Sequence, residues 1–261
     1  MPARPLVFIT GASSGIGRAL AECYHRAGWR LALVARRELE IKSWASAHQL
    51  SASSYQIYGA DVAQMDSIIA AGQACLARQG LPDVVIANAG ISVGMDTAER
   101  ADLDVMARVF ATNNLGLAAT FHPFISAMTQ RGSGRLVGIG SVAGIRGLPG
   151  HGAYCASKAA VISYCESLRG ELRGSGVRVV TISPGYVDTP LTRENRYRMP
   201  FLMTPEAFAE SAFKAIETGS SYRVIPWQMG VAAKLLRLLP NPWFDRLLQG
   251  RPRKHRQPPS S

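Results

Sequence analysis

The sequence is poor in the residues that hold disulfides and metals. Its four cysteines, Cys23, Cys75, Cys155 and Cys165, form no C-x-x-C pair and lie in segments with helical patterns. Its five histidines stand singly along the chain. This usage predicts a reducing compartment, and so a cytoplasmic protein, with neither a disulfide framework nor a metal site.

Long apolar runs are also absent. No uninterrupted apolar stretch reaches the roughly 18 to 20 residues that a membrane-spanning helix needs. An apolar strand and a glycine turn begin too early in the chain to leave room for a secretory signal. With 47% hydrophobic and 18% charged residues, the composition is typical of a globular protein with a sizeable core.

Basic residues exceed acidic ones, but most of the excess lies at one end. The net charge is +11, and residues 234–256 contain seven lysines and arginines against the single acid Asp245. The rest of the chain is only mildly basic, which argues against a nucleic-acid groove across the fold. We therefore expect no nucleic-acid partner.

The sequence does contain a regular alternation of short apolar runs and longer helical patterns. The apolar runs begin with Leu6 to Ile9 and end with Tyr222 to Ile225, and the longest helical stretch covers Asp102 to Gln130. Such strands, alternating with helices, predict a parallel sheet buried on both faces. The expected fold class is α/β, a doubly wound parallel sheet of about seven strands with helices on both faces. Residues 1–225 would form this domain and residues 226–261 an extension.

The segment TGASSGIG, residues 10–17, connects the first expected strand to the first helix. Glycines in such a turn let the backbone approach a pyrophosphate, and the helix presents free N–H groups and the positive end of its dipole. The segment is not a P-loop, because no Gly-Lys-Ser/Thr follows the glycines. A tight turn without a ligand is the alternative.

Two arginines, Arg36 and Arg37, follow the second expected strand. An NAD-specific site usually has an acid near this point for the ribose 2′-hydroxyl, but here the nearest acid is Glu38 and it comes after both arginines. Forked guanidinium hydrogen bonds suit a phosphate dianion, so the pattern favours NADP(H) over NAD(H). The alternative is a solvated basic start of the second helix.

Tyr154 and Lys158 stand four residues apart in a segment rich in helix formers, so they share one helix face. Of the eight tyrosines, only Tyr154 has a lysine four residues later. Taken alone, the pair is either a surface contact or a phenol whose proton is controlled by an ammonium.

Several motifs occur together and in a fixed order. They are TGASSGIG at 10–17, ADV at 60–62, NAG at 88–90, Asn113 ahead of Gly116, Ser141, Tyr154 with Lys158, and PGYVDTP at 184–190. In these motifs, residues 5–225 resemble the short-chain dehydrogenase/reductase family in its ordinary, non-extended form, which implies a Rossmann-like sheet. One departure is Ala87, where the family often has asparagine.

The resemblance implies that four turns hold a dinucleotide. The glycine turn would take the pyrophosphate, the ADV turn the adenine, the NAG turn the adenosine ribose and the Pro-Gly turn the nicotinamide. The implied residues are Gly11, Ser13, Ser14, Gly15, Ile16, Gly17, Asp61, Val62, Asn88, Ala89, Gly90, Pro184, Gly185, Val187 and Thr189, with Arg36 and Arg37 for the 2′-phosphate and Tyr154 and Lys158 beside the nicotinamide.

The resemblance also assigns catalytic roles. Tyr154 would exchange a proton with the substrate oxygen, Ser141 would hydrogen-bond that oxygen, and Lys158 would bind the nicotinamide ribose. Asn113, selected by its distance from Gly116, would hold a water that relays protons. A free phenol has a pKa near ~10, and a neighbouring ammonium together with an oxidised nicotinamide favours the phenolate.

The expected function is that of an NADP(H)-dependent oxidoreductase that interconverts a ketone or aldehyde and an alcohol by hydride transfer. The small-molecule substrate is expected to be apolar or lipid-like. An NADP-binding sensor or scaffold without turnover is the alternative. The resemblance also implies a homodimer or homotetramer.

Two later segments leave their roles open. Phe201, Leu202 and Met203 either line an apolar substrate pocket or fill the core.

The extension is the second such segment. One helix face would carry Val231, Leu235, Leu238 and Leu239 beside Lys234 and Arg237, and a second amphipathic piece would begin with Trp243, Phe244, Leu247 and Leu248. These faces suit peripheral contact with an anionic membrane, and packing on the domain or on a partner subunit is the alternative. Residues 251–261 are expected to be a solvated, disordered basic end.

Overall fold

Residues 4–193, 195, 198–250, 254 and 256 are the part of the chain that the computed structural model describes. The strands are β1 (Leu6–Thr10), β2 (Arg30–Ala35), β3 (Tyr55–Gly59), β4 (Val84–Ala87), β5 (Gly134–Ile139), β6 (Val177–Pro184) and β7 (Tyr222–Ile225). The α-helices are α1 (Gly15–Arg26), α2 (Glu38–Ala47), α3 (Met65–Gln79), α4 (Arg100–Phe110), α5 (Gly116–Arg131), α6 (Gly152–Glu171), α7 (Pro190–Arg193), α8 (Pro205–Glu217), α9 (Trp227–Leu238) and α10 (Asn241–Leu248).

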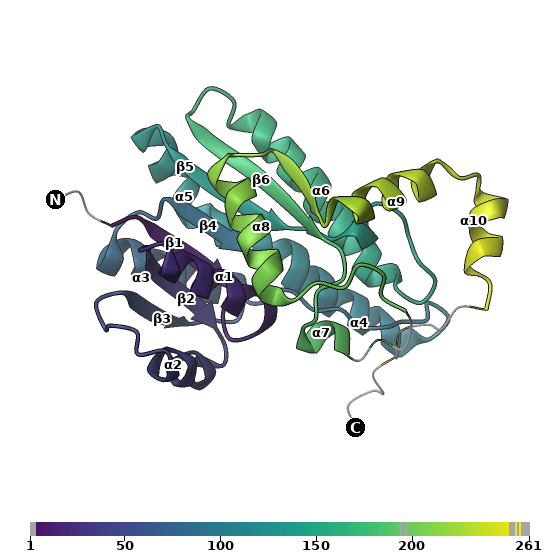
Figure 1. Ribbon diagram of the computed structural model, residues 1–261, viewed down its shortest axis with the longest axis horizontal. Helices are drawn as coiled ribbons and strands as arrows, with labels where there is room; N and C mark the ends of the chain where they lie inside the picture. Colours follow the sequence, from purple (N-terminus) through teal and green to yellow (C-terminus); the bar gives the residue numbers. More distant parts are fainter. Residues whose placement is uncertain (1–3, 194, 196–197, 251–253, 255, 257–261) are drawn as a thin grey trace.

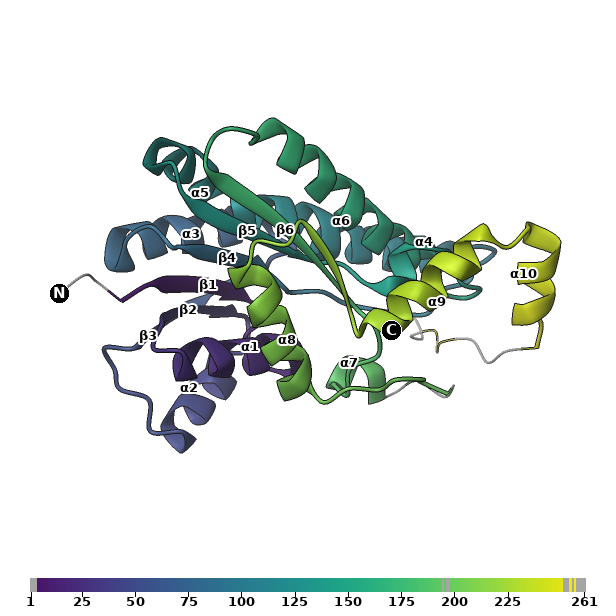
Figure 2. The ribbon, with the colours of Figure 1, turned by 45° about the horizontal axis from the view of Figure 1, so that its top comes forward.

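The seven strands form one parallel sheet in the order β3-β2-β1-β4-β5-β6-β7. Figure 2 shows α1, α2 and α8 on one face of this sheet and α3, α5 and α6 on the other. The predicted doubly wound α/β fold is confirmed. Because β1 has β2 on one side and β4 on the other, the strand order reverses there, which is where such folds open a ligand crevice beyond the strand ends.

Alternation along the strands explains the two cores. In β1, Val7 and Ile9 join the cluster under α1, α2 and α8, while Leu6 and Phe8 join the cluster under α3, α5 and α6. All five residues of β1 are buried, because successive side chains of a strand point to opposite faces and both faces are covered. This burial explains why the strands are almost continuously apolar in the sequence.

The helical stretch expected from Asp102 to Gln130 is interrupted in its middle. A π-helical turn, Ala111–Leu115, separates α4 from α5. Directly after it, an added Cβ on Gly116 would stand 2.6 Å from the carbonyl oxygen of Val62, so α5 begins pressed against the turn that follows β3. A π turn adds one residue to the helix, often at functional sites, and here it carries Asn113.

The last two helices, α9 and α10, extend beyond the sheet at one end of the molecule (Figure 1). The start of α9 packs on β7, where Gly230 lies against Val224. Among the described residues, none of the helices combines the length and the apolar content that crossing a bilayer requires.

Candidate active site

A crevice with a volume of about 740 Å³ lies beyond the carboxyl ends of the strands. This volume is typical of small-molecule and cofactor sites. The cofactor residues expected from the sequence all line it, except Gly17, and so do the expected catalytic residues Ser141, Tyr154 and Lys158. Asn113, the fourth expected catalytic residue, does not line it.

The turn between β1 and α1 forms one wall of the crevice and needs glycine at two positions. Gly11 has a φ of 69°, which side chains with a Cβ rarely adopt. An added Cβ on Gly17 would stand 2.6 Å from Nδ2 of Asn88. Gly17 therefore shapes the turn from behind, while α1 begins at the crevice wall and offers its first N–H groups to an anion.

Thr10 and Asn88 tie the glycine turn to the end of β4. Nδ2 of Asn88 donates to the carbonyl oxygen of Thr10 at 2.9 Å. Oγ1 of Thr10 accepts from the backbone N–H groups of Asn88 and Ala89, each at 3.1 Å. These three bonds hold the turns after β1 and β4 together at the position where the strand order reverses.

The end of β2 brings two guanidinium groups to the crevice. Nη2 of Arg37 donates to Oγ of Ser13 at 3.2 Å and to Oγ of Ser14 at 3.1 Å, so Arg37 reaches across to the glycine turn. Arg36 lies on the other side, with Nη1 at 3.6 Å from Oδ2 of Asp61. Both arginines line the crevice and are more than half exposed.

Glu38, the nearest acid after these arginines, has a different environment. Its carboxylate lies over Gly59 at the end of β3, where it would overlap an added Cβ, and it pairs with Lys42 at 4.0 Å. Glu38 is not among the described residues that line the crevice. The acid closest in sequence to the two arginines thus faces β3.

Ser141, Tyr154 and Lys158 meet at the opposite end of the crevice. Ser141 follows β5, and its Oγ accepts from the N–H of Ala143 at 3.1 Å. The Ser141 hydroxyl lies close enough to Tyr154 to lower the pKa of its phenol. One helical turn later, Nζ of Lys158 donates to the carbonyl oxygen of Ile139 at 2.8 Å and stands 5.9 Å from the centre of the Tyr154 ring.

Burial shifts the titration of both groups in this cluster. Desolvation raises the pKa of Tyr154, and the nearby Ser141 hydroxyl opposes that rise. Desolvation lowers the pKa of Lys158 from 10.5 to about 8, because the amine is buried. The acidic phenol expected from the sequence stays a prediction, since it also depends on the positive charge of an oxidised nicotinamide.

Asn113 lies just behind the crevice wall. Its Nδ2 donates to the carbonyl oxygen of Ile91 at 3.0 Å and to Oγ of Ser157 at 2.9 Å, and its Oδ1 accepts from the N–H of Ile91 at 2.9 Å. A Cβ on Gly90 would stand 3.2 Å from this Oδ1 and 3.5 Å from Nζ of Lys158. The side chain therefore joins the loop after β4 to α6, and its water-holding role stays a prediction.

The Pro-Gly turn after β6 closes the crevice against the glycine turn. The Thr189 side chain would stand 3.2 Å from a Cβ on Gly15. Of the segment whose role was open, Met203 packs on the core, whereas Phe201 and Leu202 are exposed. Neither exposed side chain is among the described lining residues, so neither open interpretation holds for Phe201 and Leu202.

Sequence motifs missed several residues of the wall. Ile91, Ser92 and Val93 continue the loop after β4, and Leu191 and Thr192 follow the Pro-Gly turn. Their adjacency to a motif is the one signal that could have identified them. Arg108, Ala111 and Thr112 also line the crevice; they come from the end of α4 and the π turn, where no motif marks them.

Comparison with known proteins agrees with this architecture. The family model described as short chain dehydrogenase matches residues 5–199. An uncharacterized oxidoreductase from Myxococcus xanthus is 40% identical over 91% of this chain and 93% of its own length.

Two solved structures share the fold. A short-chain dehydrogenase from Sphingobium yanoikuyae in complex with NADPH has a TM-score of 0.76 and 26% identity, over 91% of this chain and 97% of its own. A short chain dehydrogenase/reductase from Burkholderia phymatum in complex with NAD has a TM-score of 0.81 and 24% identity, over 99% and 98% of the two chains. The solved structures show the shared fold, and the family model and the Myxococcus relative establish that the chain belongs to the short chain dehydrogenase family of oxidoreductases.

Proposed function

We propose that this oxidoreductase interconverts a ketone or aldehyde and the corresponding alcohol with NADP(H), using Tyr154 as the general acid and base. The observation that carries the proposal is the cluster at one end of the crevice. There Ser141, Tyr154 and Lys158 line the same wall, Ser141 is close enough to act on the Tyr154 phenol, and the amine of Lys158 is buried one helical turn away.

The residues at the other end of the crevice fit an NADP(H) molecule. The start of α1 offers N–H groups for a pyrophosphate. Arg37, held on Ser13 and Ser14, and the neighbouring Arg36 suit a 2′-phosphate. Because Glu38 faces β3, the acid that would grip an NAD ribose at this point is directed elsewhere. NADPH in the Sphingobium structure and NAD in the Burkholderia structure mean that the family likeness alone does not choose between the two.

The chain's own groups can manage the proton of the reaction. When bound, the nicotinamide supplies or accepts the hydride. In the reducing direction Tyr154 donates its phenolic proton to the carbonyl oxygen, and Ser141 steadies the charge that develops on that oxygen. Lys158 would hold the nicotinamide ribose and, in its charged form, stabilise the phenolate left on Tyr154.

Apolar side chains support the assignment of an apolar substrate. Ile91, Val93 and Leu191 line the crevice. Hydrophobic walls with a few placed polar groups are the usual composition of small-molecule sites. A carbonyl compound with apolar bulk would be oriented by its oxygen at Tyr154 and Ser141.

Oxidation of NADPH by the purified protein across a panel of aldehydes and ketones tests the proposal. Turnover with at least one apolar carbonyl compound is expected, and it should be lost in Tyr154→Phe while NADPH still binds. Tight NADPH binding without turnover on any member of the panel would instead support the sensor or scaffold.

Three further predictions accompany this function. The homodimer or homotetramer follows from the family resemblance, and sedimentation velocity would measure it. The cytoplasmic location rests on cysteine usage; all four cysteines are buried and unpaired. The catalytic domain of residues 1–225, with its extension of residues 226–261, would be tested by expressing the two parts.

A further inference from the structure

The C-terminal helices expose an unusual amount of apolar surface. Of the fourteen large apolar side chains that are exposed among the described residues, six lie between positions 227 and 247. They are Trp227, Val231, Leu235, Leu238, Trp243 and Leu247, called here the outer face. Exposed apolar groups scattered singly need no explanation, but a concentration of this kind marks an interaction site.

Helix α9 is apolar on both of its sides. Its inner side, which includes Met229 and Gly230, is buried against the domain. Trp227, Val231 and Leu238 recur at intervals that place them along one stripe on the opposite side, and their exposed fractions are 68%, 48% and 79%. A helix that needed only to cover its own domain would carry polar residues on that stripe.

Arg146 fixes the position of these helices. Its guanidinium donates to the carbonyl oxygens of Leu236 and Leu239, the latter at 2.7 Å, and to Oδ1 of Asn241 at 3.0 Å. It also lies over the Phe244 ring, 3.7 Å from the ring centre. Arg146 belongs to the loop that follows Ser141, so the outer face is anchored to the substrate end of the crevice.

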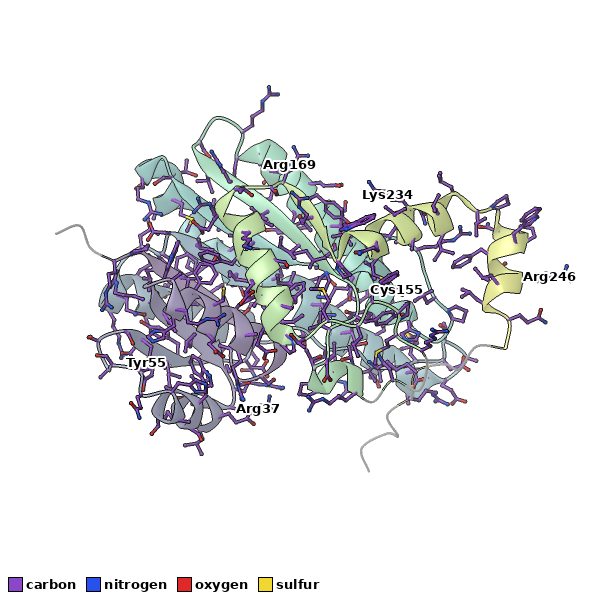
Figure 3. All side chains as sticks on the ribbon, viewed as in Figure 1. Arg37, Tyr55, Cys155, Arg169, Lys234 and Arg246 are labelled. Carbon is purple, nitrogen blue, oxygen red and sulfur yellow. The ribbon has the colours of Figure 1, made fainter. Side chains whose placement is uncertain are left out.

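Cations flank the outer face. Lys234 and Arg237 are exposed on α9, and Arg246 is exposed on α10, where Figure 3 shows it pointing away from the domain. Asp245 is the one acid between positions 227 and 250. Apolar and aromatic side chains with basic neighbours match the interface of an anionic lipid bilayer.

We propose that the outer face is a docking surface for an anionic lipid membrane. The charge distribution favours this occupant over a second copy of the chain. A two-fold dimer through the outer face would set the same basic segment against itself, whereas an anionic bilayer neutralises it. The surface is independent of the chemistry in the crevice, so its test needs no turnover.

Vesicle flotation of the full chain tests the proposal. Vesicles of phosphatidylcholine mixed with phosphatidylglycerol should bind the protein, pure phosphatidylcholine should bind much less, and added salt should weaken binding. Leu238→Gln combined with Trp243→Gln should lower the bound-to-free ratio by at least roughly tenfold. Lys234→Gln should lower it roughly fivefold.

Two matched controls separate docking from general effects. Leu39 on α2 is 78% exposed, against 79% for Leu238, so Leu39→Gln is the matched control for Leu238→Gln alone. Arg169→Gln removes an exposed cation from α6. Both variants should bind mixed vesicles like the unchanged protein.

Three results would overturn the proposal. One is equal flotation of the outer-face variants and the two controls. Another is equal binding to neutral and anionic vesicles. The third is absence of vesicle binding together with a fall in oligomeric state of the outer-face variant, measured by sedimentation velocity, which would assign the face to a second copy.

Discussion

The crevice and the C-terminal helices are built in contrasting ways. In the crevice, polar groups are held by bonds between distant segments, as between Thr10 and Asn88 or between Asn113 and both Ile91 and Ser157. The helices α9 and α10 expose six large apolar side chains, and the guanidinium of Arg146 bonds them to the loop after Ser141.

This difference fits the two functions proposed for these regions. A hydride-transfer site needs its donors and acceptors at fixed distances, so its side chains are cross-linked to the sheet. A membrane-docking surface needs accessible apolar area and charge, and it tolerates loose attachment. Substitutions in the crevice should therefore change chemistry strongly, and those in the extension should change attachment and local order.

The largest effect is expected at Tyr154. Tyr154→Phe removes the proton donor and leaves the ring, so kcat should fall by about 100-fold to 10,000-fold. NADPH affinity, measured by fluorescence titration, should stay within about twofold. Tyr164→Phe on the same helix is the matched control. Near-normal turnover of Tyr154→Phe would remove the assigned mechanism.

A smaller effect is expected at the adenosine end of the crevice. Arg36→Ala or Arg37→Ala should raise the KM for NADPH by about tenfold or more and the KM for NADH little, because the proposed guanidinium contact is with a 2′-phosphate that NADH lacks. Steady-state kinetics with both dinucleotides measure the ratio. Lys42→Ala on α2 serves as the control. Parallel changes in both KM values would contradict the 2′-phosphate assignment.

The buried amine of Lys158 should make stability depend on pH. Its pKa is 10.5 in ordinary surroundings and about 8 in the fold, so between these values the unfolded chain holds a proton that the folded chain lacks. This group then contributes stability that increases as pH rises above 8, by up to about 1 kcal/mol per pH unit, and that is lost as pH falls through 8.

Urea unfolding at several pH values checks this dependence. Between pH 8 and pH 10 the unfolding free energy of the unchanged protein should rise relative to that of Lys158→Met. The other titrating groups are common to both proteins, so their contributions cancel in this comparison. A difference that stays constant over this window would show that the amine keeps an ordinary pKa.

The smallest effect on global stability is expected from Arg146→Ala. Loss of its carbonyl bonds and of its contact with Phe244 should speed amide hydrogen exchange in α9 and α10 by roughly tenfold. The melting temperature should fall by only a few degrees, at about 1 kcal/mol of global effect. Arg146→Lys keeps the positive charge but lacks the forked guanidinium, so its exchange rates in α9 and α10 should stay close to those of Arg146→Ala. If amide exchange also became faster in β5 and β6, the expectation that Arg146 affects only the local order of the extension would be contradicted.

Much of the crevice could be predicted before its geometry was known. Apolar runs such as Leu6 to Ile9 are typical of strands buried on both faces, and parallel strands bring their carboxyl ends to one edge. The turns after those strands were therefore expected to meet, and their residues do line one crevice. Gly17 is the expected cofactor residue that does not line the crevice. It lies behind the turn, where a side chain would collide with Asn88.

Other features could not be predicted from local sequence. The π turn at Asn113 stands next to the place where Gly116 meets Val62, two residues far apart in the chain. Phe201 and Leu202 are exposed although their residue types favour burial. The expected solvated end, residues 251–261, lies mostly outside the described residues; within it, Lys254 bonds to Ser92 and Arg256 to the buried Asp102.

By itself, the sequence determined the strand and helix alternation, the glycine turn and the spacing of Tyr154 and Lys158, because these follow from periodicity and from the geometry of neighbouring residues. Only the tertiary structure decided the low pKa of Lys158, the hydrogen bond of Asn113 to Ser157 and the hydrogen bonds of Arg146 to the end of α9. Desolvation and hydrogen bonding depend on which distant groups the fold brings together, and no short segment encodes that.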